Sequence, residues 1–364
     1  MPYKISGTLT DGARVIIIEE SDWSISSSTV ETSGSFVIDE LDESGDKLVI
    51  ARRTSDGWGL GYGSVTPEYY APLARGLFAG GNISNVIDYV TIATTGNATD
   101  FGDLQTGKRM FNAVSNGTNN RGIFPGGNTS GGSTNEIDYV SCDTPANAAD
   151  FGNMFWNVNG FGAASNATSE KGWFAGGYLN DSGGTDWCHW LNIASLGNAT
   201  YGGKLSAYRW NLCATDNGTN DRGVTGGGFN GSHSNVMDYV TISTGSGATD
   251  FGDLHAQLYD GTATSNRTGN RGIFQGGWQS GDANRIDYIT ISSTGNASDF
   301  GDMISAVGRG GGCSNGTNNR GLFAVAMGSV TNTIQYVTIS TLGNAVDFGD
   351  LTQARGEGAA CANA

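Results

Sequence analysis

Apolar and polar positions alternate in short segments along the chain from about residue 71 to residue 364. Alternation with period two, in segments rich in β-branched and aromatic residues, is typical of β-strands. No segment shows the 3.6-residue period of an amphipathic helix, which excludes a helical solenoid. The clearest segments begin with an apolar residue, a polar residue and a tyrosine: IDYVTI at 87–92, IDYVSC at 137–142, MDYVTI at 237–242, IDYITI at 286–291 and IQYVTI at 334–339.

These strands belong to a repeat that occurs six times. A basic residue followed by glycine opens each copy, and successive basic residues are 46, 50, 51, 49 and 49 residues apart. Most copies continue with an apolar pair and Gly-Gly, the tyrosine strand, a turn such as GNAT, and a strand that carries DFGD or DFGN. The opening basic residues are Arg75, Arg121, Lys171, Arg222, Arg271 and Arg320.

Each repeat therefore holds four strands joined by three tight connections. Asn-Gly pairs at 116–117, 217–218 and 315–316 predict hairpins with type I′ turns, in which both central residues have positive φ. A single four-stranded sheet leaves both faces exposed, and stacking of several sheets around an axis covers them. The six copies predict an all-β fold, a six-bladed β-propeller over residues 67–364.

The first copy begins at RGLFAGG and lacks the strand that should precede it. The chain ends in LTQARGEGAACANA, which aligns with LQTGKRMFNAVSNGT at 104–118. We therefore expect the C-terminal strand to return as the innermost strand of the first blade, where it closes the propeller and removes two open sheet edges. Loss of the last ten residues should destabilise the whole ring.

The order of the strands resembles that of the kelch family, in which a strand with a basic residue precedes an apolar strand ending in Gly-Gly, a tyrosine strand and an aromatic strand. The resemblance covers residues 71–364 and implies a kelch-like β-propeller. Where kelch repeats usually carry tryptophan in the last of these strands, this chain carries the phenylalanine of DFG. The resemblance therefore implies a fold and no function. The phenylalanines are Phe101, Phe151, Phe251, Phe300 and Phe348.

Residues 1–66 predict a separate small β-domain. KISGTL, ARVIIIEE, GSFVIDEL and DKLVIARR alternate like strands, and Gly-containing turns separate them. The segment TSGSFVIDEL followed by KLVIARR resembles small carboxypeptidase-regulatory-like or immunoglobulin-like β-sandwiches. We expect a boundary at Thr66-Pro67 and an attachment role for this domain, and a structural cap is the alternative.

Composition excludes several classes of partner. The formal charge is −16 with only five lysines, so nucleic acid and anionic membranes are disfavoured. No apolar run approaches the length of a membrane span, and the first residues, MPYKISGT, lack the apolar core of a signal peptide. Five cysteines lie within apolar strand patterns without CxxC spacing, which predicts buried free thiols.

Catalytic patterns are absent from the sequence. Its three histidines (His189, His233 and His255) occupy different repeat positions, and the glycines follow the repeat instead of forming a phosphate loop. Two aspartates three residues apart recur in DFGD, but they fall short of a calcium shell of 6 to 8 oxygens. We expect them to pair with the repeated arginines or to cap turns. The sequence predicts no enzyme, no cofactor and no metal.

One loop of the repeat varies in length, and it lies between Gly-Gly and the tyrosine strand. The residue after Gly-Gly is aromatic in three consecutive copies. Aromatic rings beside amide and carboxylate side chains suit sugars, and variable loops on a rigid scaffold often bind ligands. This predicts a glycan-binding rim, with local packing of the rings as the alternative. The predicted rim residues are Tyr178, Asp181, Trp187, Phe229, His233, Trp278, Gln279 and Asp282.

The third copy departs most from the others. His189 and Trp190 replace the usual Asp and Tyr, and Tyr201-Gly-Gly-Lys204 replaces DFGD. Five of the eight tryptophans lie between 156 and 210. A specialised interface and compensated divergence are both open interpretations.

The phrases RGLFAGGN, IDYVTIATTGNATDFGDL and SNGTNNRG, repeated in tandem, resemble those of structural proteins of tailed phages, especially marine and cyanobacterial ones. The resemblance implies a location on the exterior surface of the virion, contacts with other virion proteins through residues 1–66, and a homo-oligomer. We predict a non-enzymatic virion protein, a tail fibre, another appendage or a capsid decoration, that displays the propeller for host adsorption through a surface glycan. The alternative is a propeller enzyme acting on host surface polysaccharide, which should show converging carboxylates in one pocket.

Overall fold

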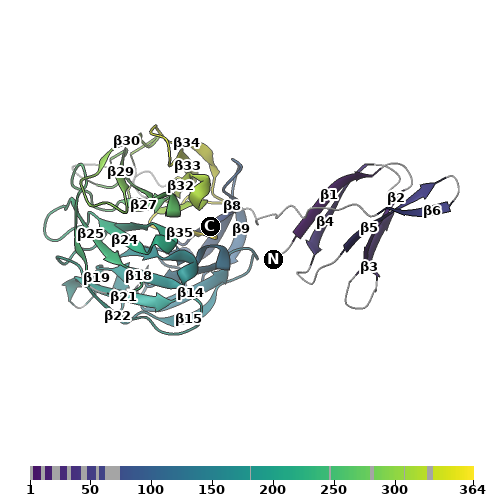
Figure 1. Cartoon of the computed structure of the whole chain (residues 1–364). Coiled ribbons are helices and arrows are strands. Elements are labelled where there is room, and N and C mark those ends of the chain that lie inside the picture. Colours follow the sequence, from purple (N-terminus) through teal and green to yellow (C-terminus); the bar gives the residue numbers. More distant parts are fainter. Residues whose placement is uncertain are drawn as a thin grey trace. The chain divides into compact units, whose positions relative to one another are not determined.

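The computed structural model describes residues 74–364 except Asp181, Ser246, 279–282, Val307 and 326–330, and it gives the strands before residue 74 without their side chains. The chain divides into two compact units, Met1–Pro72 and Leu73–Ala364 (Figure 1). Both units are built of β-strands. The boundary expected at Thr66-Pro67 lies outside the described residues.

The first unit contains a strand pair and a four-stranded antiparallel sheet. Strand β1 pairs with β4, and the sheet has the order β3-β2-β5-β6. The four strands predicted from sequence are present as β1, β2, β4 and β5, while the serine-rich β3 and the short, glycine-rich β6 were not predicted. The strands are β1 (Tyr3–Leu9), β2 (Ala13–Ile18), β3 (Ile25–Val30), β4 (Gly34–Leu41), β5 (Lys47–Thr54) and β6 (Gly57–Gly61).

Within the described residues, the second unit contains six antiparallel sheets of four strands each. In chain order, the first is β35 (Ala359–Ala362), β7 (Arg75–Ala79), β8 (Val86–Thr91) and β9 (Thr99–Asp103). The second is β10 (Val114–Ser115), β11 (Arg121–Pro125), β14 (Glu136–Ser141) and β15 (Ala149–Asn153). The third is β17 (Gly162–Ser165), β18 (Lys171–Ala175), β21 (Trp187–Asn192) and β22 (Thr200–Lys204).

The remaining sheets follow the same order of strands. The fourth is β23 (Cys213–Asp216), β24 (Arg222–Gly226), β25 (Val236–Thr241) and β26 (Thr249–Asp253). The fifth is β27 (Thr262–Ser265), β28 (Arg271–Gln275), β29 (Arg285–Thr290) and β30 (Ser298–Asp302). The sixth is β31 (Gly311–Ser314), β32 (Arg320–Ala324), β33 (Thr333–Thr338) and β34 (Val346–Asp350). Short strands in the loops are β12 (Asn128–Thr129), β13 (Gly132–Ser133), β16 (Val158–Asn159), β19 (Tyr178–Leu179) and β20 (Gly183–Gly184).

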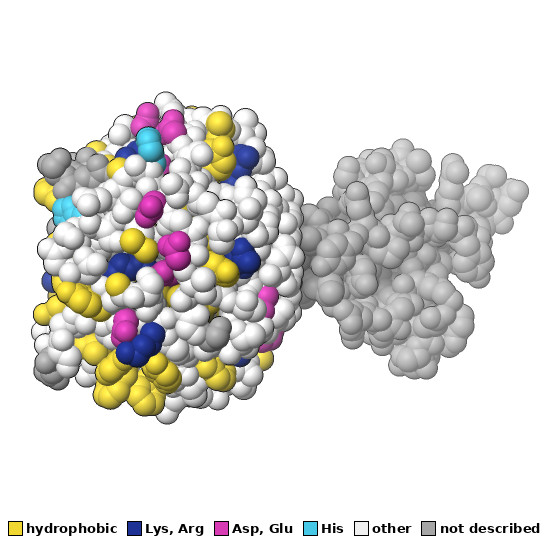
Figure 2. Space-filling model, turned by 60° about the vertical axis from the view of Figure 1, so that its left-hand side comes forward, with side chains coloured by type: hydrophobic (Ala, Val, Ile, Leu, Met, Phe, Trp, Pro, Cys, Tyr) yellow, Lys and Arg dark blue, Asp and Glu magenta, His cyan; other side chains and the backbone are white. Residues whose placement is uncertain are grey.

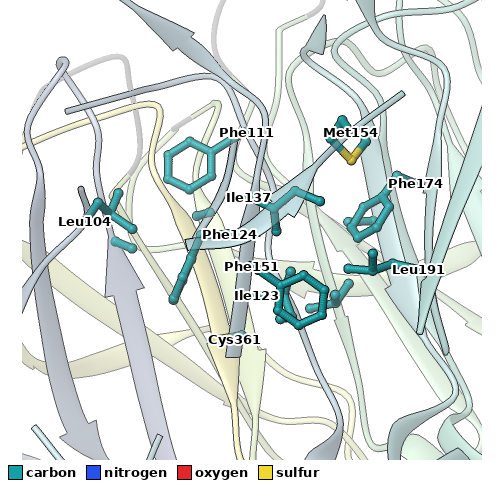
Figure 3. Packing of buried hydrophobic residues seen from close by; sticks show 14 of the residues in the cluster. Leu104, Phe111, Ile123, Phe124, Ile137, Phe151, Met154, Phe174, Leu191 and Cys361 are labelled. Carbon is teal, nitrogen blue, oxygen red and sulfur yellow. The ribbon is translucent and has the colours of Figure 1, made fainter. Parts of the chain in front are cut away.

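The sheets bury their second strands on both faces. Adjacent residues of a strand point to opposite faces, yet Leu77 and Phe78 of β7 are both fully buried. Leu77 belongs to an apolar cluster that continues into the second sheet through Ile123, and Figure 3 shows part of this cluster. Phe78 belongs to another cluster that contains Leu322 of the sixth sheet. The first sheet is therefore covered by the second sheet on one face and by the sixth on the other.

The connection between the first and second strands corrects a sequence prediction. Asn116 has a φ of −91°, so the Asn-Gly pair does not form a type I′ turn, and residues 117–119 form a short 3₁₀-helix instead. The amide oxygen of Asn116 accepts a hydrogen bond from the N–H of Arg121 at 2.6 Å. Asparagine competes for main-chain partners in this way, and here it closes a longer loop. The 3₁₀-helices are η1 (Gly117–Asn119), η2 (Ala167–Ser169), η3 (Gly218–Asn220), η4 (Arg267–Gly269) and η5 (Gly316–Asn318).

The C-terminal segment pairs with the first repeat as predicted. Strand β35 is antiparallel to β7, with Ala359 opposite Ala79 and Ala362 opposite Gly76. The amide oxygen of Asn363 accepts a hydrogen bond from the N–H of Arg75 at 2.7 Å. This bond is equivalent to the one between Asn116 and Arg121 in the second sheet. The last residues of the chain thus occupy the repeat position that their alignment indicated.

The repeated basic residues connect neighbouring sheets. The guanidinium of Arg121 lies over the ring of Tyr139 at 5.1 Å and donates to the carbonyl of Ile193 in the next sheet at 2.7 Å. Arg320 of the sixth sheet donates to the carbonyl of Ile92 beside the first sheet at 3.0 Å. The expected pairing of these arginines with the DFGD aspartates is wrong for the described residues, because their guanidinium groups bind main-chain carbonyls and cover a tyrosine ring. The asparagine of GNAT adds a second connection, since Asn147 accepts from the N–H of Asp103 at 3.0 Å.

A ring of main-chain hydrogen bonds joins the six sheets just before their first strands. The N–H of Gly160 donates to the carbonyl of Met110 at 2.7 Å, and the N–H of Met110 donates to the carbonyl of Glu357 at 2.7 Å. Six residues form this ring among the described part of the chain, and all have positive φ: Met110, Gly160, Asn211, Asp260, Arg309 and Glu357. The first strands also contact one another in succession, from β35 through β10, β17, β23, β27 and β31 back to β35.

Among the residues that the structure describes, the charged side chains buried between sheets have partners of opposite charge. The carboxylate of Asp138 lies 2.9 Å from the ammonium of Lys108, and the carboxylate of Asp88 lies 2.8 Å from the guanidinium of Arg355, with each of these side chains at most 1% exposed. A third pair of this kind is Arg209 and Asp238. Each acid comes from the tyrosine strand of one sheet and each base from the connection that leaves the preceding sheet.

The other three sheets lack the base at this position and differ in the acid. Val158 and Leu258 occupy it before the third and fifth sheets. In the third sheet the acid is replaced by His189, and burial lowers the pKa of this imidazole to about 4, so it is neutral at pH 7. In the fifth sheet Asp287 pairs with Arg285 of its own strand at 2.9 Å, and the sixth sheet carries the neutral Gln335. An unpaired buried charge is costly, and none occurs at these positions.

Candidate functional site

A continuous group of aromatic rings comes from loops of the third and fourth sheets and from the connections that lead to the fourth and fifth sheets. We call Tyr178, Tyr208, Trp210, Phe229, His233 and Tyr259 the aromatic strip. Tyr208 stacks on Trp210 with ring centroids 6.4 Å apart, and Trp210 lies 5.0 Å from Phe229. Phe229 lies 5.5 Å from Tyr259, and the imidazole of His233 stacks on Tyr259 at 5.4 Å.

The strip is built where two kinds of loop meet. Residues that follow Gly-Gly pair through main-chain hydrogen bonds with residues of the connection that leads to the next sheet. Trp210 and Phe229 form one such pair, with the N–H of Phe229 donating to the carbonyl of Trp210 at 2.9 Å. Gly184 makes room for the indole of Trp210, because a Cβ at this glycine would lie 2.3 Å from the ring.

Three of the predicted rim residues belong to the strip. Tyr178, on β19, is 37% exposed and packs edge-on against Trp210 at 5.7 Å. Phe229 and His233 lie on the loop between β24 and β25, and both are half-buried. Their aromatic faces are shared between contacts with one another and with solvent, so packing and binding are compatible interpretations of these rings.

The other predicted rim residues divide into two groups. Trp278 is 45% exposed, and its main-chain N–H donates to the main-chain carbonyl of Tyr259 at 2.6 Å, which places Trp278 beside the strip. Trp187 belongs to a second aromatic group, where it packs on Trp156 at 5.3 Å. Asp181, Gln279 and Asp282 lie outside the described residues.

Three residues of the strip, Tyr208, Trp210 and Tyr259, were not among the predicted rim residues. These residues lie in connections whose length is the same in every copy, whereas the prediction followed the loops of variable length. A signal was present: Trp210 and Tyr259 both lie twelve positions before the next basic residue, where other copies carry Arg109, Asn159 and Gly308. Two aromatic residues at one repeat position, next to the predicted Phe229 and Trp278, would have indicated the strip.

The second aromatic group has a different origin. Phe155 and Trp156 are 52% and 41% exposed, and Phe155 lies 6.2 Å from the imidazole of His189. In other copies the residue at this position binds the buried acid, as Ser206 does with Asp238. Because His189 replaces that acid, apolar side chains occupy the same loop in the second copy.

A small pocket, which we call the axial pocket, lies inside the ring of main-chain hydrogen bonds. Its volume is about 30 Å³, and its lining includes Asn211, Asp260, Arg309 and Glu357. The guanidinium of Arg309 lies 2.6 Å from the carboxylate of Asp260 and 2.5 Å from that of Glu357. Arg109 approaches Glu357 from the other side at 2.8 Å. The charges of the four groups balance.

Electrostatics in the axial pocket centre on Asp260. This residue is 8% exposed, and burial raises the pKa of its carboxyl to about 6, although Arg309 acts in the opposite direction. No donor meets its Oδ1 atom with good hydrogen-bond geometry, although the amide of Asn211 lies near enough to act against the rise in the pKa of this carboxyl. Figure 2 shows a face of the second unit on which acidic and basic side chains gather near the middle and hydrophobic side chains gather toward the lower left.

A second cavity runs between the first strands of the sheets. Its volume is about 60 Å³, and small residues of all six first strands line it. The guanidinium of Arg267 reaches into one end, where it donates to Ser165 Oγ at 3.1 Å and Ser115 Oγ at 3.2 Å and pairs with Asp216 at 3.1 Å. With its donors satisfied, Arg267 holds the first strands together.

Metal and thiol chemistry would need clusters of ligating or nucleophilic side chains. No cluster of three or more His, Cys, Asp or Glu is arranged to hold a metal among the residues that the structure describes. All five cysteines lie in described strands or beside them, and they are buried free thiols, as predicted. Within the described residues no helix has the length and apolar character needed to cross a membrane.

Comparison of the chain with models of known protein families gives no match, and comparison with curated proteins gives none either.

Proposed function

We propose that the second unit is a six-bladed kelch-like β-propeller closed by the C-terminal strand, and that residues 1–66 form a small β-sandwich. Three observations support this architecture: the six four-stranded sheets, the pairing of β35 with β7, and the ring of main-chain hydrogen bonds that returns from Glu357 to Met110. In a propeller each sheet is covered on both faces by its two neighbours. The first sheet fits this arrangement, because Leu77 and Phe78 on its opposite faces belong to apolar clusters shared with different neighbouring sheets.

The protein is a non-enzymatic structural protein on the exterior of a tailed phage virion, as a tail fibre, another appendage or a capsid decoration. The resemblance of its tandem phrases to phage structural proteins supports this role. Residues 1–66 attach the chain to other virion proteins, and several copies assemble together. Nucleic acid and membranes are not partners in this proposal, because the charge of −16 repels polyanions.

The propeller binds a glycan of the host surface through the aromatic strip, and this strip is the observation that carries the proposal. Rings from three consecutive sheets form one surface, and Tyr178, Tyr208 and the adjacent Trp278 are 37%, 49% and 45% exposed. Sugars present apolar C–H faces that stack on such rings, while their hydroxyls need polar partners. Tyr208 and Asn230, which are hydrogen-bonded to each other at 2.8 Å, provide polar groups at the edge of the strip.

A propeller enzyme acting on surface polysaccharide is the second candidate. The observation in its favour is that two carboxylates, Asp260 and Glu357, converge in the axial pocket. Both carboxylates are engaged by Arg309, and the pocket has room for about one water molecule. A sugar ring that spans a cleavable bond would not fit there, so the binding role is favoured.

Replacement of Phe229 and Trp278 together by alanine tests the binding role. We expect the double variant to lose at least about tenfold in affinity for the bacterial surface polysaccharide that the wild-type chain binds best on a glycan array, because each ring contact contributes about 1 kcal/mol. Tyr201→Ala is the matched control, since Tyr201 is 48% exposed but lies outside the strip.

The same experiment separates the two candidates. The wild-type chain, but not the double variant, should also compete with virions for adsorption to host cells. Retention of polysaccharide without a change in its length supports the binder, whereas depolymerisation that Asp260→Asn abolishes would support the enzyme. Equal affinity of the double variant and the wild type would rule out the strip as the binding surface.

A further inference from the structure

The aromatic strip and the axial pocket meet at Tyr259. The phenol oxygen of Tyr259 accepts hydrogen bonds from the amide of Asn211 at 3.0 Å and from the guanidinium of Arg309 at 3.0 Å. Asn211 and Arg309 both line the axial pocket, and Asp260 follows Tyr259 in the chain. The Tyr259 end of the strip therefore lies beside two residues that line the pocket.

The size of the axial pocket limits what can enter it. A volume of about 30 Å³ corresponds to one water-sized group. The ring of main-chain hydrogen bonds surrounds the pocket, and Asn211 and Asp260 belong to this ring. A single hydroxyl or amino group fits such a space, whereas a whole sugar ring must remain outside on the strip.

The chemistry of the pocket selects a hydrogen-bond donor. Asp260 is more than nine-tenths buried, and its Oδ2 atom faces Arg309, whereas its Oδ1 atom accepts no hydrogen bond of good geometry and has only the amide of Asn211 as a weak neighbouring donor. A buried acceptor without a well-placed donor is costly, so a donor from a ligand gains more here than at the surface. Because Arg109 and Arg309 already balance Asp260 and Glu357, a neutral hydroxyl suits the pocket better than a cation.

We propose that the axial pocket is a subsite that accepts one hydroxyl of a neutral glycan lying on the aromatic strip, with Asp260 Oδ1 as its acceptor. The inference rests on the proposed function and names the class of glycan. The charge of −16 argues in the same direction, because it repels polysaccharides rich in carboxylate, sulfate or phosphate. Aromatic stacking provides affinity along the strip, and the buried acceptor fixes which sugar occupies its end.

Asp260→Gly tests the subsite with little disturbance of the ring. The residue has a φ of 63°, which glycine adopts without strain, and glycine is the natural residue at the equivalent position, Gly160. Arg309 keeps its partner Glu357 in this variant. Asp260→Asn serves as a second variant should the glycine variant melt at a lower temperature than the wild type.

The ligands for the test are linear hexasaccharides of glucose, galactose and mannose, with oligogalacturonate as the charged counterpart. Titration calorimetry of the full chain should show binding of at least one neutral hexasaccharide and weaker binding of oligogalacturonate. Asp260→Gly should bind that hexasaccharide about tenfold more weakly, in line with the loss of a hydrogen bond to a charged group, and Asp260→Asn should lose less, because its amide oxygen still accepts but carries no charge. A deoxy analogue lacking the recognised hydroxyl should bind the wild type and Asp260→Gly equally.

Two negative results lead to different conclusions. Unchanged affinity of the Asp260 variants, together with weakened binding by the Phe229 and Trp278 double variant, would overturn the subsite and leave the binding role of the strip intact. Absence of binding of every neutral hexasaccharide to the wild type would overturn the subsite as defined here, and insensitivity of polysaccharide binding to the double variant would overturn the proposed function itself.

Discussion

The first and third sheets of the second unit differ in how the chain builds them and in which repeated residues they keep. The first sheet combines β35 from the C-terminus with β7, β8 and β9 from the start of the repeats, yet it has the Arg355–Asp88 pair and the Asn363 hydrogen bond to Arg75. The third sheet is continuous in the chain, yet it carries His189 where the first sheet has Asp88.

The difference shows that the repeated residues depend on the neighbouring sheet and not on continuity of the chain. Arg355 precedes the first sheet in space and supplies the base for Asp88, although the two are far apart in sequence. Val158 precedes the third sheet and supplies no base, and His189 is neutral there because burial lowers its pKa to about 4. A buried acid at this position is thus present only where a base pairs with it, either from the preceding connection, as Arg355 does for Asp88, or from its own strand, as Arg285 does for Asp287.

Removal of residues 355–364 is the strongest test of the first sheet. The deletion removes β35 and leaves Asp88 buried without Arg355, which alone costs about 3–5 kcal/mol. With the added loss of a strand, we expect destabilisation of at least about 5 kcal/mol, enough to unfold a domain of ordinary stability. Thermal melting followed by circular dichroism measures this effect.

Removal of residues 363–364 alone provides the control for this deletion. It takes away the three hydrogen bonds of Asn363, two with Arg75 and one with Asn120, but leaves β35 and Arg355, so it should cost about 1–3 kcal/mol. A long deletion that melts at the wild-type temperature would show that the C-terminal strand does not hold the sheets together, and it would count against the closed propeller.

His189→Asp makes the third sheet resemble the first in charge but leaves it without a base. Val158 and His189 are 1% and 4% exposed, so the new carboxylate would be buried and unpaired. We expect a loss of about 3 kcal/mol, and the addition of Val158→Lys should restore most of it, as Lys108 does for Asp138. Urea unfolding of the single and double variants completes the cycle.

His189→Asn is the neutral control for this cycle. It should cost less than His189→Asp, because no charge is buried. A single variant with the carboxylate that is as stable as the wild type, or a lysine at 158 that gives no rescue, would contradict the rule that a buried charge between sheets requires a partner of opposite charge.

Most of the strands could be predicted because the same strand pattern recurs in several copies of the repeat. The tyrosine strands, the Gly-Gly strands and the return of the C-terminal segment are all local patterns that alignment of the copies reveals. The prediction of a type I′ turn at Asn116-Gly117 was wrong because the asparagine side chain binds the N–H of Arg121. Residue composition does not indicate this competing local hydrogen bond. The buried pair of Lys108 and Asp138 also escaped prediction, since it depends on the register between two sheets.

The candidate site could be predicted only in part. Tyr178, Phe229 and His233 were identified from variable loops, and the structure brings them together with Trp210 and Tyr259. The latter two lie in connections of constant length, whose proximity to the loops follows from main-chain pairing between them. Trp187 was grouped with the strip by residue type, but it packs with Trp156 instead.

The pH dependence of stability offers a smaller effect that is specific to the third sheet. His189 has a pKa of about 4 in the folded protein and an ordinary value near 6.5 when unfolded, so the unfolded chain binds more protons between these values. Stability contributed by this residue is therefore complete above about pH 6.5 and falls as the pH drops toward 4, by at most about 3 kcal/mol. The raised pKa of Asp260, about 6, gives a pH dependence of stability of the opposite sign over nearly the same range, because the folded protein holds the proton of Asp260 more tightly.

The pH dependence of the wild-type stability alone is then uninformative, and the difference between the wild type and His189→Gln isolates the histidine. Glutamine is the neutral residue that the sixth sheet carries at this position, as Gln335. Urea unfolding at pH 7 and pH 4.5 should show the variant gaining stability relative to the wild type at the lower pH, whereas a constant difference would mean that His189 becomes protonated within the fold as easily as in the unfolded chain.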